Sequence, residues 1–226
     1  MSLLAPSPAG GARAHWVVYP PRVPDDVVTL RGEEFSGELR GVSLVGATLA
    51  ETVGPLVVDG GRVTRTDLTA SRFLRPSLCD LVLLDCNLAN LRWGGAAMTR
   101  TTYQECQMTG FDVNSSTLVD VQFLGCRLSL ASFRFLAQAK VRFVDCEMDG
   151  ADFQGVDLRA CHFENCILTG SLFHQAKSEG VDLRGSSLTG LQGIDGLRGA
   201  VIDQLQLLDL ADSLASQAGL TVRVSD

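Results

Sequence analysis

Five of the seven cysteines recur at intervals of twenty residues: Cys86, Cys106, Cys126, Cys146 and Cys166. Thiolates can bind a metal ion or serve in redox reactions, but a metal site needs ligands that converge from several directions. A strict period of twenty instead stacks these side chains in parallel if twenty residues complete one turn of a repeating structure. Stacked Cβ vectors also disfavour disulfides. We therefore expect a buried structural column of reduced thiols, with no metal and no cofactor.

Other residues that could carry chemistry show no motif. The three histidines, His15, His162 and His174, do not fall at a metal-ligand or triad spacing. The sequence has no P-loop, no GxGxxG after a strand and no HExxH. A repeating coil filled by its own side chains also lacks a concave pocket. We expect no catalytic residues and no enzymatic activity.

Charge is unevenly distributed along the chain. Residues 1–144 hold 13 acids and 14 bases, a net charge of +1, whereas residues 145–226 hold 13 acids and 5 bases, a net charge of −8. The run that contributes most is Asp145, Glu147, Asp149, Asp152, Asp157 and Glu164. This run is either the solvated surface of an acidic protein or a partner-binding surface on a rod that is negative at one end.

The elements that position these residues follow a period of five. From Gly61 to Gly190 the third residue of each five is apolar in all but two of 26 units, the exceptions being Gln138 and Ser178. The first residue is small or apolar, and every charge falls on the second, fourth or fifth. Neither a helix nor an alternating strand has this period. A coil that turns a corner after each unit does, and four units per coil explain the cysteine spacing.

The central residues favour the same grouping by four. The seven phenylalanines at third positions lie on two opposite sides of such a coil: Phe73, Phe133, Phe153 and Phe173 on one, and Phe123, Phe143 and Phe163 on the other. Leu, Met and Val occupy the remaining sides, so that large and slim residues fill a square cross-section. We expect Gln138 to disturb its coil, because a buried amide without partners is costly.

The units ADFQG, VDLRA, VDLRG, TDLTA and CNLAN resemble the pentapeptide-repeat family, whose pattern is roughly A-(D/N)-L-x-x. The resemblance covers Gly37 to Gly190. It implies an all-β solenoid, a right-handed quadrilateral β-helix of pentapeptide repeats with a short C-terminal α-helix. At about 4.8 Å per coil, the 26 units would form a rod about 31 Å long.

Breaks in the pattern predict three segments. Residues 1–33 are proline-rich and are expected to form an irregular N-terminal arm. Residues 34–190 form the β-helix, with a change of phase near 52–61, where Thr52–Gly61 is a candidate bulge or loop. Residues 191–226 form a C-terminal cap, with a dimerisation helix at 201–218 and a short strand in LTVRV.

The helix-plus-strand ending resembles that of the pentapeptide-repeat proteins that protect DNA gyrase. This resemblance implies a homodimer through the C-terminal end, with an interface that includes Val201, Ile202, Leu205, Leu208 and Leu214. The partner would be DNA gyrase or topoisomerase IV, bound by DNA mimicry, with possible protection from fluoroquinolones. Two joined acidic halves would carry about −16, which matches about 27 Å of duplex. The alternative is a scaffold rod with an unrelated partner.

The remaining expectations concern location and other ligands. No apolar run reaches the length of a membrane span, and the N-terminus lacks a signal-peptide core. We expect a cytoplasmic protein that does not enter membranes. The net charge of −7 argues against direct binding of nucleic acid.

Overall fold

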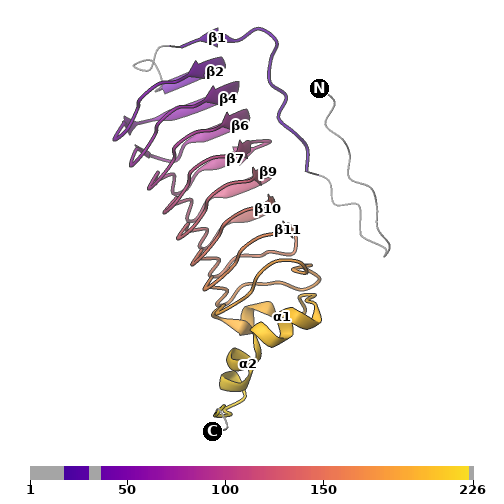
Figure 1. The fold of residues 1–226 in the computed structure, drawn as a ribbon. Coiled ribbons are helices and arrows are strands. Elements are labelled where there is room, and N and C mark those ends of the chain that lie inside the picture. The colour runs from indigo at the N-terminus through magenta and orange to yellow at the C-terminus, as the bar shows by residue number, and fades with distance from the viewer. Residues whose placement is uncertain (1–17, 31–36, 224–226) are drawn as a thin grey trace.

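The computed structural model describes residues 18–30 and 37–223, which form a rod of stacked coils (Figure 1). All the strand pairs are parallel, and the main sheet runs in the order β1-β2-β4-β6-β7-β9-β10-β11, with β8 beside β6 and β9; β3 and β5 pair separately. The strands are β1 (Val28–Thr29), β2 (Gly37–Val45), β3 (Val53–Gly54), β4 (Leu56–Thr64), β5 (Arg72–Phe73), β6 (Ser77–Leu84), β7 (Ala97–Thr99), β8 (Thr102–Gln104), β9 (Thr117–Leu124), β10 (Gln138–Val144) and β11 (Cys161–Glu164).

The coil repeats every twenty residues. One ladder of bridges joins Asp67, Asn87, Gln107, Arg127, Glu147, Ile167 and Ser187, each twenty residues from the next. Four five-residue units therefore make one coil, and the predicted all-β solenoid is confirmed.

We name the four sides by their central residues. Side A holds Val63, Leu83, Tyr103, Phe123, Phe143, Phe163 and Leu183; side B holds Leu68, Leu88, Met108, Leu128, Met148, Leu168 and Leu188; side C holds Phe73, Trp93, Val113, Phe133, Phe153 and Phe173; side D holds Leu78, Met98, Leu118, Leu158 and Ser178. All of these side chains are buried.

Most corners of the coil are made by a residue with left-handed backbone at the fifth position of the unit; Lys140 and Ala160 are the exceptions between Arg65 and Gly190. Asp85, Asn90 and Phe135, for example, have φ of 53°, 55° and 53°. A turn hydrogen bond accompanies the corner, as where the Ala96 amide donates to the Trp93 carbonyl at 3.0 Å. Non-glycine residues adopt this conformation at a cost, so packing inside the coil must offset it.

Aromatic rings form two stacks in the core. On side A the rings of Phe123 and Phe143 lie 5.2 Å apart at 7°, and on side C those of Phe133 and Phe153 lie 5.1 Å apart at 4°. Rings from the two sides meet edge to face, as do Phe143 and Phe153 at 6.0 Å and 84°. Offset stacks and edge contacts are the favoured geometries of aromatic pairs.

The five cysteines at twenty-residue spacing lie in one buried column at the corner between sides A and B. Each thiol lies close to backbone carbonyls; the Cys126 thiol, for example, donates to the Tyr103 carbonyl at 3.5 Å. Contact with the Cys126 thiol, together with burial, raises the pKa of Cys106 to about 12. Thr66 and Ser186, also buried, continue the column at its two ends.

The change of phase is a one-residue shortening, and residues 52–61 form no projecting loop. Val53 pairs with Arg72, nineteen residues on, whereas Val57 pairs with Ser77, twenty residues on. Residues 53–54 and 56–64 are the strands β3 and β4. The coil therefore loses one residue on side C and keeps its course.

Gln138 points outward, and its neighbour Ala139 takes the central position. The register between β9 and β10 shifts between Lys140 and Val141, so that Ala139 pairs with Leu118. Gln138 is exposed and Ala139 is buried. The local disturbance expected at Gln138 is thus a register slip that keeps the amide in solvent. Ser178, in contrast, stays buried, and its hydroxyl has no hydrogen-bond partner.

The described part of the N-terminal arm lies along the rod, at the corner between sides D and A (Figure 1). The Arg22 amide donates to Asp80 Oδ1 at 2.8 Å, and the Lys140 ammonium lies 5.1 Å from the centre of the Tyr19 ring. At its end, β1 pairs with β2 and covers the edge of that strand. Residues 18–27 contain no helix or strand, and they span the corners of several coils.

The C-terminal end holds a 3₁₀ helix, η2 (Ile194–Leu197), and two short helices, α1 (Gln204–Asp209) and α2 (Ala211–Gln217), in place of the single helix expected at 201–218. Leu210, between α1 and α2, is buried against the rod and separates them. The bridge between Asp182 and Val201 extends the coil beyond residue 190. Residues 220–223 of the expected strand are not in a strand. No described helix is long and apolar enough to cross a membrane.

Gln206 closes the open end of the coil. Its side-chain amide donates to the carbonyls of Leu183 and Ser186 at 2.5 and 2.6 Å, and its carbonyl oxygen accepts from the Asp203 amide at 2.8 Å. Asp203 in turn caps the first turn of α1. Carbonyls that a further coil would have bound are thereby satisfied.

The position of Gln138 leads to a stability prediction. We expect Gln138→Leu to change the free energy of unfolding by less than about 0.5 kcal/mol, because the side chain is in solvent. Leu118→Ala, in the central position that pairs with Ala139, should cost about 2–5 kcal/mol. Urea denaturation followed by circular dichroism measures both. A stabilisation of more than about 1 kcal/mol by Gln138→Leu would place this side chain in the core.

The thiol column leads to a labelling prediction. In the native protein at pH 8, the five column cysteines should react with a disulfide exchange reagent only after unfolding. All five are buried, and for Cys106 a raised pKa of about 12 leaves a thiolate fraction of only about 10⁻⁴ at this pH. Cys79, which is half-buried, is the internal control and should react first. Rapid modification of all five without unfolding would contradict the packing.

Candidate functional site

The six acids of the expected partner-binding surface lie on all four sides of the rod. Glu147 and Asp149 are on side B, and Asp145 is at the corner between sides A and B. Asp152 is on side C, Asp157 on side D, and Glu164 on side A. Each unit turns one corner, so a run of acids along the sequence is wound around the coil. Only Asp145, Glu147 and Asp149 share one region.

Arginines neutralise four of these six acids. The ion pairs are Arg127–Glu147 at 3.3 Å, Arg134–Asp152 at 3.6 Å, Arg159–Asp157 at 2.6 Å and Arg142–Glu164 at 2.9 Å. The guanidinium groups of Arg159 and Arg142 lower the pKa of Asp157 and of Glu164 respectively. Among the described residues, Asp145 and Asp149 form no ion pair.

The pairing reduces the charge available to a partner. Arg127, Arg134 and Arg142 belong to the first 144 residues, but they lie against the acidic segment. When these three positive charges are added to residues 145–226, the net charge of this part of the rod changes from −8 to about −5. The surface is still negative, although less so than the sequence segment.

A shallow depression of about 360 Å³ adjoins two of the acids on sides A and B. Glu105, Gln107, Gly125, Cys126, Arg127, Asp145 and Glu147 line it. Gly125 has no side chain at the corner, and a Cβ there would lie 2.8 Å from Glu105 Oε1. The Glu105 carboxylate therefore leans over this gap, so the depression has three carboxylates and one guanidinium.

Further acids, which the sequence interpretation did not single out, surround the C-terminal helices. They are Asp195, Asp203, Asp209 and Asp212, of which all but Asp203 are exposed. Asp203 is held by the first turn of α1, and the amide of Gln206 lowers its pKa. Mapping the chain in units of twenty would have placed these acids together at the end of the rod.

The five residues of the expected dimer interface fall into two groups. Val201 is exposed, and Ile202 is partly buried against the core, both at the end of the last coil. Leu205, Leu208 and Leu214, on α1 and α2, have exposed fractions of 75%, 69% and 38%. The exposed Leu207 and Leu220 extend the same end.

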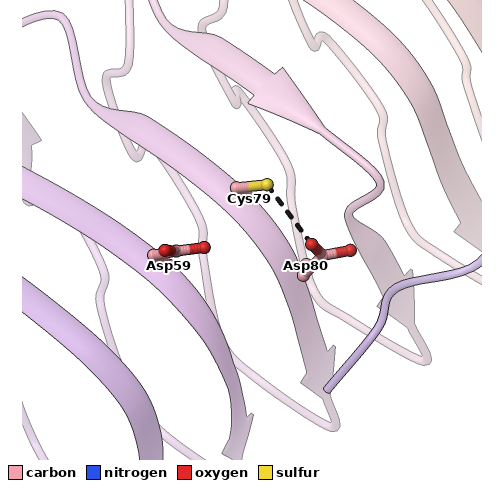
Figure 2. Close-up of side chains that lie close together, drawn as sticks. All are labelled: Asp59, Cys79 and Asp80. Atoms are coloured by element: carbon pink, nitrogen blue, oxygen red, sulfur yellow. Dashed lines mark hydrogen bonds between the residues drawn. The ribbon is translucent and has the colours of Figure 1, made fainter. Parts of the chain in front are cut away.

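Three side chains with metal-ligand atoms lie together on β4 and β6: Asp59, Cys79 and Asp80, whose ligand atoms are within 4.8 Å of one another (Figure 2). The Asp80 carboxylate already has partners. Arg100 donates to both of its oxygens at 2.6 Å and lowers the pKa of Asp80 to about 2. The Cys79 thiol donates to Asp80 Oδ2 at 3.4 Å. A cation would have to displace Arg100, so this group is best explained as the ion pair onto which the arm docks.

The histidines lie apart from one another. His162 lies 3.5 Å from Glu164 on side A, and His174 lies 3.8 Å from Asp195 on side C. His15 lies outside the described residues. The two described rings belong to surface charge networks.

Comparison with known proteins gives one family match. A family model described as a pentapeptide repeat region matches residues 116–192. No curated protein matches the sequence.

Solved structures are similar to this chain at low sequence identity. A trypsin-treated variant of QnrB1, a plasmid-mediated fluoroquinolone resistance protein, is 17% identical, with coverage of 86% of this chain and 95% of that one and a TM-score of 0.41. Full-length QnrB1 is 16% identical, with coverage of 79% and 100% and a TM-score of 0.30. HetL, a pentapeptide repeat protein involved in heterocyst differentiation regulation from the cyanobacterium Nostoc, is 16% identical, with coverage of 76% and 92% and a TM-score of 0.22. These values are too low to transfer a function.

The family match covers coils whose five-residue units, left-handed corners and twenty-residue ladders are described above. The chain therefore contains a pentapeptide repeat region, folded as a four-sided β-solenoid.

Proposed function

We propose that the chain is a protein-binding rod that dimerises through its C-terminal end and that imitates DNA toward DNA gyrase or topoisomerase IV in the cytoplasm. One observation carries this proposal: exposed leucines and unpaired carboxylates occur together at that end. The binding would rest on charge and shape, with no catalytic step.

The C-terminal helices offer a surface suited to a second copy. Leu205, Leu207 and Leu208 are exposed on α1, and Leu214 is exposed on α2, which extends away from the last coil (Figure 1). Exposed apolar patches rimmed by polar residues mark interaction sites. Asp209 and Asp212 supply such a rim. A second rod that packs on these leucines would continue the cylinder end to end.

The dimer would place its acids around the junction. With Arg127, Arg134 and Arg142 included, each half carries about −5, so the centre of a dimer carries about −10. At one charge per roughly 1.7 Å, this matches about 17 Å of duplex, less than the 27 Å that the sequence segment alone implies. The segment would thus imitate a short stretch of DNA.

A scaffold rod is the alternative, and the pairing of the acids favours it. Glu147, Asp152, Asp157 and Glu164 have cationic partners and lie on four different sides. A projecting loop at residues 52–61 would have been the candidate for contact with a drug-bound enzyme. These residues lie mostly in β3 and β4 instead. Protection from a fluoroquinolone is therefore a separate question from binding, and a supercoiling assay with and without drug separates the two.

The first prediction concerns the dimer. We expect Leu208→Arg with Leu214→Arg to give a monomer that keeps the β-helix, since two charges would enter an apolar junction. Inhibition of gyrase supercoiling should fall at least about tenfold, because the acidic surface is halved. Light scattering after size exclusion measures the oligomer. The control is Val45→Arg, since Val45 is also exposed but lies on β2, at the other end of the rod from the helices. A double variant that inhibits as well as wild type would contradict the proposal.

The second prediction concerns the unpaired acids. Asp145→Asn with Asp149→Asn should weaken gyrase inhibition about threefold to tenfold at low salt, at about 0.2–1 kcal/mol per exposed charge. Asp157→Asn is the matched control and should have a smaller effect, because Arg159 already neutralises Asp157. The difference should shrink at high salt. If the wild type never inhibits, the scaffold function is the better explanation.

A further inference from the structure

The N-terminal part of side C carries an exposed group of residues, which we name the arginine patch: Val53, Arg72, Leu74, Arg75 and Arg92. The sequence RFLR supplies three of them, with Phe73 turned into the core between Arg72 and Leu74. Val53 pairs with Arg72 from the preceding coil, and Arg92 bridges to Arg72 from the following one. Four of the five lie on side C, over adjacent coils, and Arg75 lies at the corner between sides C and D.

The three arginines are uncompensated among the described residues. No ion pair there joins Arg72, Arg75 or Arg92 to an acid. The cations that do have an acidic partner are Arg40, Arg100, Arg127, Arg134, Lys140, Arg142, Arg159 and Arg184. Asp112, which bridges to Arg92, uses its carboxylate to accept the Asn114 amide. Like charges on directly paired residues destabilise a sheet, so an anionic partner would relieve a real cost here.

The same place exposes the two most accessible large apolar side chains outside the C-terminal helices. Leu74 is 82% exposed and Val53 is 75% exposed. Leu74 stands at the fourth position of its unit, which faces outward, and the register changes from nineteen to twenty residues beside it, between Gly54 and Val57. An exposed leucine therefore lies beside the three arginines.

Two glycines leave the surface beside the arginine patch without side chains. Gly94 and Gly95 follow Trp93 on side C and carry no side chains. The Arg75 side chain extends over Gly95, where a Cβ would lie 3.3 Å from Arg75 Cγ. A chain laid across these glycines could reach the guanidinium groups from the side.

We propose that the arginine patch docks an acidic segment of a partner protein that also carries apolar side chains. Carboxylates would pair with the guanidinium groups of Arg72, Arg75 and Arg92, in the bidentate geometry that arginine favours. Apolar side chains would cover Leu74 and Val53. These two residues, together with the net charge of −7, favour an acidic peptide over a nucleic acid. The patch lies at the end of the rod opposite α1 and α2, so it is independent of the proposed dimer.

The test measures binding of a fluorescein-labelled twelve-residue peptide rich in Asp, Glu and Phe, by anisotropy, to the full chain. Arg72→Gln with Arg92→Gln should weaken binding at least about tenfold, and Leu74→Ser about threefold. Arg62→Gln with Arg65→Gln is the matched control, because these arginines also form no ion pair with any described residue but lie on side A and its corner. It should bind as wild type does. A peptide with Lys in place of Asp and Glu should not bind.

Several results would overturn the proposal: no binding of the acidic peptide to wild type, equal losses in the two double variants, or competition by a twelve-base-pair duplex as strong as that by the peptide. The melting temperature distinguishes a binding role of Arg72 and Arg92 from a purely structural one. Arg72→Gln with Arg92→Gln should not lower it at low salt, since repulsion is removed, and a clear fall would assign these arginines to stability instead.

Discussion

The corner at every fifth residue is the constraint on which the rest of the structure depends. At Arg65, Asp85, Asn90 and most of the equivalent positions the backbone turns through the left-handed region, so the next unit starts on a new side. Each such residue costs free energy unless it is glycine, and the coil tolerates the cost because every corner directs another apolar residue inward. Side-chain direction is then fixed by position within the five. Once Leu88 points into the core, its neighbours on either side must face solvent.

Stacking converts this local rule into long columns. Residues twenty apart meet in the same environment, so each column can specialise: thiols at one corner, rings on sides A and C, slimmer residues on sides B and D. A column of small thiols packs a corner without steric conflict, and contact with neighbouring thiols together with burial raises the pKa of Cys86 and of Cys106. The core is therefore self-similar along the rod, and the outer surface is left free to vary.

This division explains which parts the sequence could predict. The inward residues from Val63 to Leu188 follow one period, so the solenoid and its core were accessible by counting. The slip that turns Gln138 outward depends on whether a neighbouring alanine can take its place, which counting does not reveal. The split of the terminal helix at Leu210 and the closing role of Gln206 depend on the shape of the last coil. The scattering of the acids over four sides, in contrast, was implicit in the period, and a linear count of charge concealed it.

The two proposed binding surfaces occur where the regular coil is interrupted. The register change near Gly54 lies beside the exposed Leu74 and its neighbouring arginines, and the end of the repeat exposes the leucines of α1 and α2. In the regular coils between them, several charges are paired across neighbouring coils, as in Arg127–Glu147 and Arg142–Glu164. About five coils separate the two surfaces, a distance of about 24 Å. Because parallel ladders run the whole length, this distance is fixed, and a partner that contacts both surfaces must match it.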